Sequence, residues 1–297
     1  MKNKEWILVL ALGTLWGSSF FFVEVLLNFL SPFFIVYLRV LFASLILIIV
    51  ILIKKEQIEF NFTNIFNLSV MALLNNIIPF LLIAIGQQTT TGGLASILNA
   101  NTSLVAIILA SIIIPYEKLT FKRILGVSIG MVGVILALDY QNMFQFFNNN
   151  IGKYLILLAT VSYAFASIWA KLKLKNLSPL VSATGMLLMS TILLSPYIFT
   201  FQMHEIYNLN LTIILYAFVF AFLCSVLAYL LYFKILETTG AGNLLICTII
   251  IPPSAILLDV IIMKQKITIS ELLGLIVIIV GLLILDGRLI SKKKFIR

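Results

Sequence analysis

The chain has 297 residues, of which 62% are hydrophobic and only 10% are charged, and its mean hydropathy is +1.16. Soluble domains are about 45–50% apolar and about 25% charged, so this composition excludes an ordinary soluble domain and indicates an integral membrane protein. The formal net charge of +9 does not indicate nucleic-acid binding, because the basic residues are scattered through short connections, as in loops that set membrane topology.

Ten apolar segments are long enough to cross a bilayer, since a spanning helix needs about 20 apolar residues. Helices satisfy their own backbone groups in lipid, and these runs are too long for the strands of a barrel. The first resembles a signal peptide, but no clear cleavage site follows, so we expect a retained helix. The predicted spans are residues 6–27, 33–53, 66–86, 93–114, 122–138, 152–170, 179–200, 211–233, 242–263 and 269–287.

The basic residues predict the orientation of these spans. Of the 20 Lys and Arg residues, Lys153, Lys264 and Lys266 lie in predicted outside segments and Arg39 lies within a span. The remaining 16 (20 − 3 − 1) lie inside when the N-terminus is cytoplasmic. The positive-inside rule therefore predicts cytoplasmic termini and a multi-pass protein of the plasma (inner) membrane.

Short motifs recur at an almost constant offset, which predicts a duplicated unit. Three motif pairs lie 147 or 148 residues apart: LSP at 30–32 and 177–179, TTGG at 90–93 and TTGA at 238–241, EKLT at 117–120 and QKIT at 265–268. We expect an all-α protein with a first five-helix repeat at 1–138, an outside linker at 139–151 and a second repeat with a basic cytoplasmic tail at 152–297. Because five is odd, the second repeat is inverted, as in many transporters with a midplane binding site.

The third span carries two adjacent amides, Asn75 and Asn76, followed by Pro79. An amide that faces lipid lacks partners, so both should face protein or water. They either hold helices together, at roughly 1 kcal/mol per hydrogen bond, or line a substrate cavity with Asn76 toward the substrate. Pro79 removes a helical hydrogen bond and is expected to free the carbonyl of Asn75.

Small and polar residues form one face of the fourth span. Ser96, Asn99 and Ser103, continued by Ala106 and Ala110, follow spacings of three and four residues, which place them on one side of a helix. Such a stripe either permits close helix packing or lines a water-filled path. The positions of Asn99 and Ser103 near the midplane favour the path.

Other spans place polar or aromatic side chains at mid-depth, where they either pack or line the same cavity. We assign to the cavity Trp16 and Ser19 of the first span, Tyr163 and Ser167 of the sixth, and Ser225 and Tyr229 of the eighth.

Few charges lie within the spans. Glu24 and Arg39 have similar depths on either side of the first turn, and we expect an ion pair because unpaired charges in lipid are costly; the alternative is a gate or proton-sensitive latch. Asp259, in the outer part of the ninth span, either titrates with transport or reaches the interface. Glu117, at the cytoplasmic end of the fourth span, is expected in a loop salt bridge or a cap.

Several residues are expected to be architectural. Gly126 and Gly130 in the fifth span, and Gly274 and Gly281 in the tenth, suit close contacts between helices. Residues 268–271 form a capping box that begins the tenth span.

These motifs resemble those of the EamA-type branch of the drug/metabolite transporter superfamily. WGSSF at 16–20 is similar to its first-helix signature, and the arginine of YLRVLFA at 37–43 to its second-helix arginine. NNIIPF at 75–80 with GLASILNA at 93–100 resembles its third- and fourth-helix motif, and EKLT at 117–120 the following turn. The resemblance implies a ten-helix carrier with a central cavity, usually exporting amino acids or other small metabolites.

The chain departs from the family pattern at several positions. The proline often found near Ser103 is absent, although the second repeat keeps it as Pro252. Glu24 stands where many relatives carry lysine, and Gln265 replaces the glutamate of the second EKLT-like turn. Because of these changes, the resemblance does not imply a particular substrate or coupling of transport to protons.

The sequence therefore predicts a secondary transporter that exports small metabolites, amino acids or related amphipathic solutes, by alternating access. The alternative is a membrane channel or a non-transporting membrane scaffold. We expect no enzyme, cofactor or metal site, because the single histidine, His204, lies outside the predicted spans and no catalytic or nucleotide motif is present. The expected partners are a small-molecule substrate and the lipid bilayer, without nucleic acid, and the sequence is compatible with a monomer.

Overall fold

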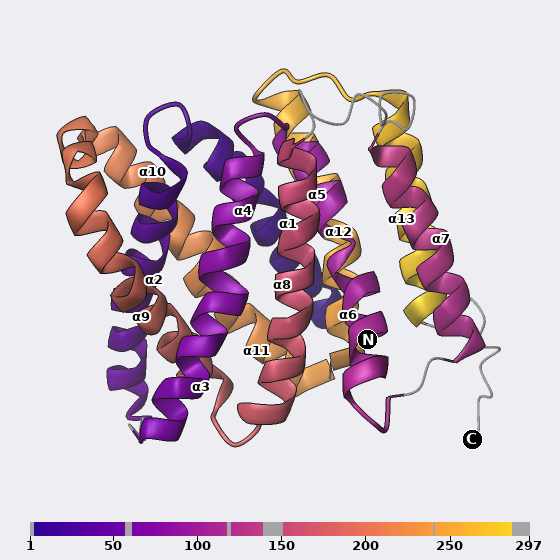
Figure 1. Ribbon diagram of the computed structural model, residues 1–297, viewed down its shortest axis with the longest axis horizontal. Helices are drawn as coiled ribbons and strands as arrows, with labels where there is room; N and C mark the ends of the chain where they lie inside the picture. The colour runs from indigo at the N-terminus through magenta and orange to yellow at the C-terminus, as the bar shows by residue number, and fades with distance from the viewer. Residues whose placement is uncertain (1–2, 57–60, 118–119, 139–150, 240, 287–297) are drawn as a thin grey trace.

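The structure, a computed structural model, describes residues 3–56, 61–117, 120–138, 151–239 and 241–286, in which every regular element is a helix (Figure 1). The elements are α1 (Asn3–Leu26), α2 (Pro32–Lys54), α3 (Phe62–Ala72), η1 (Leu73–Ile77), α4 (Ile78–Gly86), α5 (Gly92–Asn99), α6 (Thr102–Ile113), α7 (Phe121–Ala137), α8 (Ile151–Lys173), α9 (Pro179–Tyr197), η3 (Ile198–Gln202), η4 (Met203–Asn208), α10 (Leu211–Ala221), η5 (Phe222–Leu227), α11 (Ala228–Thr239), α12 (Ala241–Ile261) and α13 (Ile269–Asp286). The predicted linker and the basic tail fall almost wholly outside the described residues.

The helices are those of a multi-pass membrane protein. Among the described residues, seven helical stretches are long and apolar enough to cross a membrane, and the shorter apolar helices Cys247–Ile261 and Ile269–Leu285 follow them. The elements occupy the predicted spans in chain order, and several spans consist of consecutive helical pieces. The number of crossings and the side of the termini remain predictions.

The repeated LSP motif begins the second helix of each half. The side-chain oxygen of Ser31 accepts the amide of Phe34 at the start of α2, and Ser178 accepts the amide of Val181 at the start of α9. A serine cap followed by proline at the first helical position is a favoured helix start. The predicted capping box is also confirmed, because Thr268 and Glu271 exchange side-chain-to-backbone hydrogen bonds.

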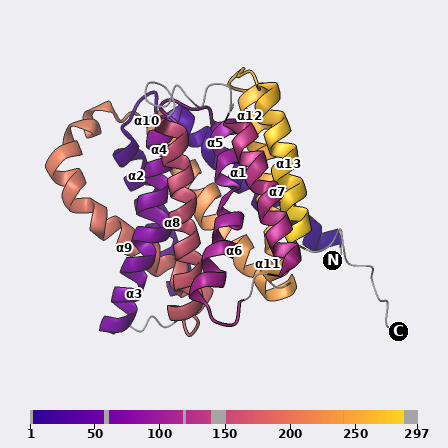
Figure 2. The same cartoon turned by 45° about the vertical axis from the view of Figure 1, so that its right-hand side comes forward.

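Glycines allow α7 and α13 to pack in direct contact, side by side in Figures 1 and 2. A Cβ atom on Gly126 would lie 2.9 Å from the carbonyl oxygen of Gly281, and one on Gly133 would lie 2.8 Å from that of Gly274. Gly130 faces Leu104 of α6 and also touches Gly281. The predicted close helix contacts at these glycines are confirmed.

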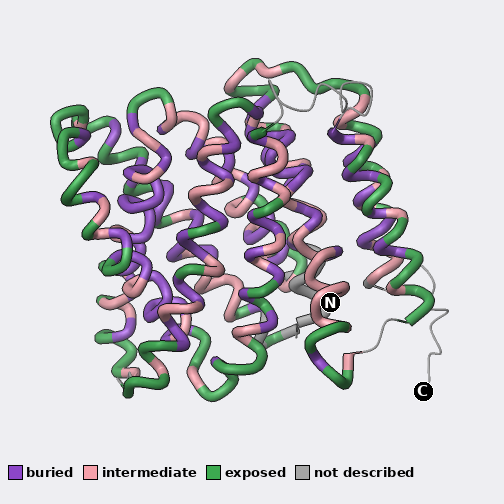
Figure 3. Tube along the Cα trace, viewed as in Figure 1, coloured by how far each residue is buried: buried purple, intermediate pink, exposed green. Residues whose placement is uncertain are grey.

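The two halves of the chain pack against each other along several helix pairs. α1 packs on α12, α2 packs on α9, and α8 packs on α4 and α6. At the α2–α9 contact the hydroxyl oxygens of Ser44 and Thr191, 147 residues apart in sequence, are 3.3 Å apart. Figure 3 shows buried residues on the inner faces of these helices and exposed residues at their ends and outer faces.

Three helices are irregular in their middle. The π-helical segments η1 and η5 occupy corresponding places in the two halves, beginning at Leu73 and Phe222. The fourth span breaks between α5 and α6 at Ala100 and Asn101. π-Helical turns and breaks inside helices are frequent at functional sites, and the side chains at these three places are therefore candidates for one.

Candidate functional site

Five polar side chains meet in the interior of the bundle, and we call them the central cluster: Arg39, Asn75, Tyr163, Ser225 and Tyr229. They come from α2, η1, α8, η5 and α11, and therefore from both halves of the chain. The π-helical segments η1 and η5 each supply one member, Asn75 and Ser225. Four of the five were predicted to line the cavity, whereas Arg39 was predicted to form an ion pair with Glu24 or, alternatively, to act as a gate.

Arg39 lies at the centre of this cluster and is buried. Its Nε donates to the hydroxyl of Ser225 at 3.0 Å, and its Nη2 donates to the carbonyl of Cys224 at 3.4 Å. The guanidinium carbon lies 3.8 Å from the ring centre of Phe80 and 4.6 Å from that of Phe220. Aromatic faces and neutral oxygens stabilise a cation but do not cancel its charge.

The predicted ion pair between Glu24 and Arg39 is wrong, because the structure gives the two residues separate partners. Glu24 accepts hydrogen bonds from the amide of Gly92 and the side chain of Gln265. Among the described residues, salt bridges join only Glu117 to Lys171 and Arg123, which confirms the loop salt bridge at Glu117. Similar depth placed Glu24 and Arg39 together in the prediction, but their helices direct the side chains to different neighbours.

The surroundings of the two asparagines favour the reverse of the assignment expected for them. Asn76 is completely buried, and its Nδ2 donates to the hydroxyl of Ser190 on α9 at 3.0 Å. Asn75 is only half-buried, and its Nδ2 lies within hydrogen-bond distance of Tyr229 Oη at 3.3 Å and of Met186 Sδ at 3.6 Å. Asn76 therefore holds two helices together, and Asn75 is the amide that a solute could reach.

Replacing Asn76 with alanine is expected to lower the stability of the fold, whereas Asn75→Ala should leave it nearly unchanged. The first change removes an interhelical hydrogen bond and opens a buried void, at an expected cost of about 1–2 kcal/mol. Thermal unfolding of the purified variants in detergent measures the difference. Equal melting temperatures for the two variants would contradict these roles.

Pro79 frees a different carbonyl from the one predicted. In the π-helical segment the amide of Ile78 bonds the carbonyl of Leu73, five residues earlier, so the next carbonyl in this pattern is that of Leu74. Its partner would be the amide of residue 79, which proline lacks. The hydroxyl of Ser162 on α8 donates to the Leu74 carbonyl at 2.8 Å, and the freed group is therefore used to join two helices.

The polar stripe of the fourth span divides into packed and accessible parts. Ser96 is buried, and its hydroxyl donates to the carbonyl of Gly93 in its own helix. Asn99 and Ser103 are half-buried on either side of the break. The side-chain oxygen of Asn99 is buried and has no hydrogen-bond partner among the described residues. Since buried polar atoms normally have a partner, Asn99 is the stripe residue best suited to bind a solute or water.

Aromatic rings connect Trp16 of α1 to the central cluster. The ring of Trp16 lies 6.0 Å from that of Tyr232, which contacts Phe233, and Phe233 in turn stacks with Tyr229. This chain of rings gives the cluster one apolar, aromatic side. Sequence reasoning missed Phe233, and it also missed Phe80 and Phe220, because single aromatic residues are common in apolar spans.

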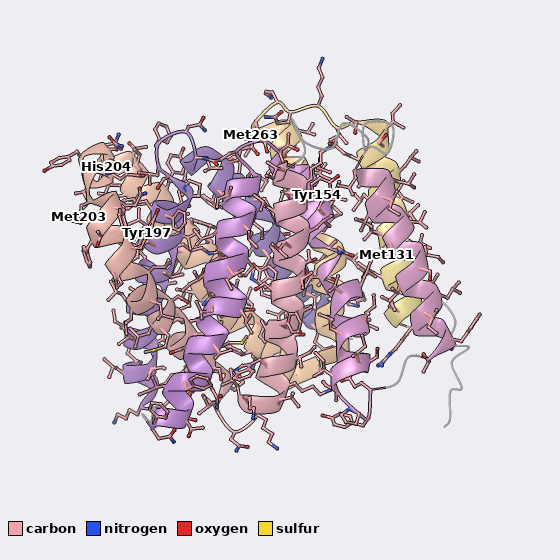
Figure 4. The ribbon with its side chains drawn as sticks, viewed as in Figure 1. Met131, Tyr154, Tyr197, Met203, His204 and Met263 are labelled. Carbon is pink, nitrogen blue, oxygen red and sulfur yellow. The ribbon has the colours of Figure 1, made fainter. Side chains whose placement is uncertain are left out.

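Among the predicted cavity residues, Tyr163 belongs to the cluster, whereas no hydrogen bond joins Ser167 or Ser19 to it in the described part of the chain. Tyr163 is half-buried and close enough to Arg39 to interact with it electrostatically. The hydroxyl of Ser167 donates to the Ala164 carbonyl of its own helix, and Ser19 is half-buried. His204 lies at the end of the bundle, near Met203 (Figure 4), and not in the cluster.

A second polar site lies where α5 begins. The carboxylate of Glu24 accepts the amide of Gly92, and that of Asp259 accepts the amide of Gly93. Gln265 donates to Glu24 at 3.2 Å, so two of the positions that depart from the family pattern are in contact. The charge pattern predicts this end of the bundle outside the cell, and we call it the outer end.

Comparison with known proteins shows that the sequence of this chain is similar to those of transporters. The sequence profile of the EamA-like transporter family matches residues 3–138 and 150–285. An uncharacterized transporter of Archaeoglobus fulgidus is 22% identical over 95% of this chain and 98% of its own length, and the uncharacterized transporter YetK of Bacillus subtilis is 24% identical over 90% and 82%. A solved crystal structure superposes with a TM-score of 0.68 at 13% identity, covering 99% of this chain and 100% of that one, which shows a shared fold.

Proposed function

The chain belongs to the EamA-like transporter family, and we propose that it is a secondary carrier that exports small metabolites, amino acids or related amphipathic solutes, across the plasma membrane. The observation that carries this proposal is the central cluster, in which side chains of both halves meet. A site shared by two halves changes its access when the halves rock against each other. The cluster is therefore suited to alternating access.

Contacts between corresponding residues support the proposed inverted repeat. Ser44 meets Thr191, its equivalent at an offset of 147. At an offset of 148, Gly126 corresponds to Gly274 and Gly133 to Gly281, and the contacts are exchanged: the first glycine of each helix meets the second of the other. Such reciprocal contacts are expected around a two-fold axis.

The correspondence between the two halves also supports a functional role for Arg39. At the offset of 147, residue 39 corresponds to Met186. Each of these corresponding residues contacts the π-helical segment of the opposite half: Met186 Sδ lies near Asn75 Nδ2 in η1, and Arg39 Nη2 donates to the carbonyl of Cys224 in η5. A neutral side chain thus fills the equivalent place, so packing alone does not require a cation there. We propose that Arg39 binds the carboxylate of the substrate, which would supply the missing counter-charge.

Counterflow in proteoliposomes tests the proposal. We expect saturable exchange of at least one radiolabelled amino acid from a panel of L-amino acids, with aromatic members favoured by the rings around Tyr229. Saturable counterflow would exclude a channel or a scaffold, and its absence across the panel, with folded protein in the vesicles, would contradict a carrier for amino acids.

Removing the hydroxyl group of Tyr229 is expected to reduce counterflow by about threefold to tenfold, because one hydrogen bond contributes about 0.5–1.5 kcal/mol. Tyr229→Phe keeps the ring that stacks on Phe233. Tyr207→Phe is the matched control, since Tyr207 is 92% exposed in η4. Equal rates for both variants at equal abundance would place Tyr229 outside the substrate site.

A further inference from the structure

We propose that Glu24 and Asp259 share one proton, and that this proton-binding pair latches the outer end of the bundle. The two carboxylates come from α1 and α12, which belong to different halves of the chain. Both accept backbone amides at the start of α5, where the helix dipole favours negative charge. One helix start therefore holds an acidic side chain from each half.

Gly92 shows how close the two carboxylates are. A Cβ atom on Gly92 would lie 3.0 Å from Asp259 Oδ1 and 3.0 Å from Glu24 Oε2. Two distances of 3.0 Å from one point place these oxygens at most 3.0 + 3.0 = 6.0 Å apart. Like charges at this separation, with Asp259 buried and Glu24 half-buried, disfavour the state in which both groups are ionised.

The hydrogen-bond pattern leaves a place for the proton. Asp259 is 2% exposed, and its Oδ1 has no hydrogen-bond partner among the described residues, although its Oδ2 accepts the amide of Gly93. A buried acceptor without a donor is costly. A proton on Oδ1 would turn this oxygen into a donor, at most 6.0 Å from Glu24 Oε2.

The surrounding charges favour this protonated state. Lys266 and Glu271 line the same small hollow as Asp259, and α5 contributes no titratable side chain. Gln265, which donates to Glu24, is neutral. In the part of the chain that the structure describes, no lysine or arginine forms a salt bridge with either member of the pair. The hollow therefore holds two carboxyl groups and one ammonium group, and the Glu24 carboxylate beside Gly92 adds a third carboxyl group.

The pair joins parts that must separate if the outer end opens. Glu24 on α1 contacts α5 and the connection 262–268, whose Met263 lies at that end in Figure 4, and Asp259 on α12 contacts α5. Loss of the shared proton leaves two negative charges side by side, and their repulsion weakens the closed arrangement. This role in opening, unlike the proton itself, rests on the proposed alternating access.

Infrared difference spectroscopy of the purified protein in lipid, between mildly acidic and alkaline pH, tests the shared proton directly. The wild type should show a protonated carboxyl band that disappears at alkaline pH. Glu24→Gln and Asp259→Asn should each lose this band, because an amide N–H takes the place of the proton, whereas Glu271→Gln should keep it. A band that is absent from the wild type, or that persists in both variants, would overturn the proposal.

A cysteine in place of Ile256, which lines the hollow, reports whether the outer end opens. Because maleimides react with the thiolate, labelling by a membrane-impermeant maleimide is divided by that of a Tyr207→Cys variant at the same pH, since Tyr207 is 92% exposed. This ratio should rise severalfold from acidic to alkaline pH, and should be independent of pH when Glu24→Gln is added. The infrared result does not require transport. If the protein shows saturable counterflow but no protonated carboxyl band, only the proton-binding pair is disproved. If it shows the band but no counterflow, only the proposed carrier function is disproved.

Discussion

Replacing Arg39 with methionine is expected to leave a folded protein that has lost transport of carboxylate-bearing substrates. Truncating one partner of a buried charged pair costs about 2–5 kcal/mol, which corresponds to a loss of about 30-fold or more in apparent affinity. Methionine is the matched replacement, because Met186 already fills the corresponding position of the second half. It preserves apolar contact with Phe80 and Phe220, which now enclose the guanidinium.

The substrates themselves distinguish a binding role from a structural one. Counterflow is compared for an aromatic amino acid and for the amine that lacks its carboxylate. If Arg39 binds the carboxylate, the wild type should prefer the acid, and Arg39→Met should remove this preference. If Arg39 only holds α2 against η5 through Ser225 and Cys224, the variant should lower the melting temperature and reduce both rates by the same factor.

Arg39→Lys is expected to restore little of this transport. A lysine keeps the charge but lacks the planar group that stacks between two rings and donates in fixed directions. Recovery of wild-type rates in the lysine variant would show that charge alone suffices.

The sequence indicated which polar residues lie within the spans, but it did not predict which neighbours their side chains contact. Glu24 and Arg39 were placed at similar depths, yet one reaches the start of α5 and the other the central cluster. Depth follows from counting residues along a span, whereas direction depends on how each helix is rotated about its axis. A sequence of nearly uniform hydrophobicity contains little information about that rotation.

Local irregularity explains why the sequence did not predict the separate surroundings of Asn75 and Asn76. Spacing arguments assume an α-helix with 3.6 residues per turn, but both asparagines lie in the π-helical segment η1. The wider turn shifts the directions of the side chains that follow, so Asn76 reaches Ser190 on α9. The glycine contacts could be predicted because α7 and α13 are regular helices. The spacing of the glycines along such helices is enough to indicate where two backbones can approach closely.

Replacing Gly274 with leucine is expected to separate α7 from α13 and to lower the yield of folded protein sharply. A Cβ atom at this position would lie 2.6 Å from the backbone nitrogen of Ala137 and 2.7 Å from the carbonyl oxygen of Gly133. These are backbone atoms, which cannot move aside as the end of a side chain can. Even Gly274→Ala should therefore destabilise the protein, by about 1–3 kcal/mol, and leucine should cost more.

Thermal unfolding in detergent and the recovery of monodisperse protein measure this effect. Val132→Leu is the control, because Val132 is 52% exposed on α7 and the added volume projects away from the contact. If the two halves are related by a two-fold axis, Gly126→Ala should destabilise the protein by an amount similar to Gly274→Ala, since the two glycines occupy corresponding places in exchanged contacts. A large effect at one glycine and none at the other would contradict that symmetry, although the close packing at the sensitive position would remain.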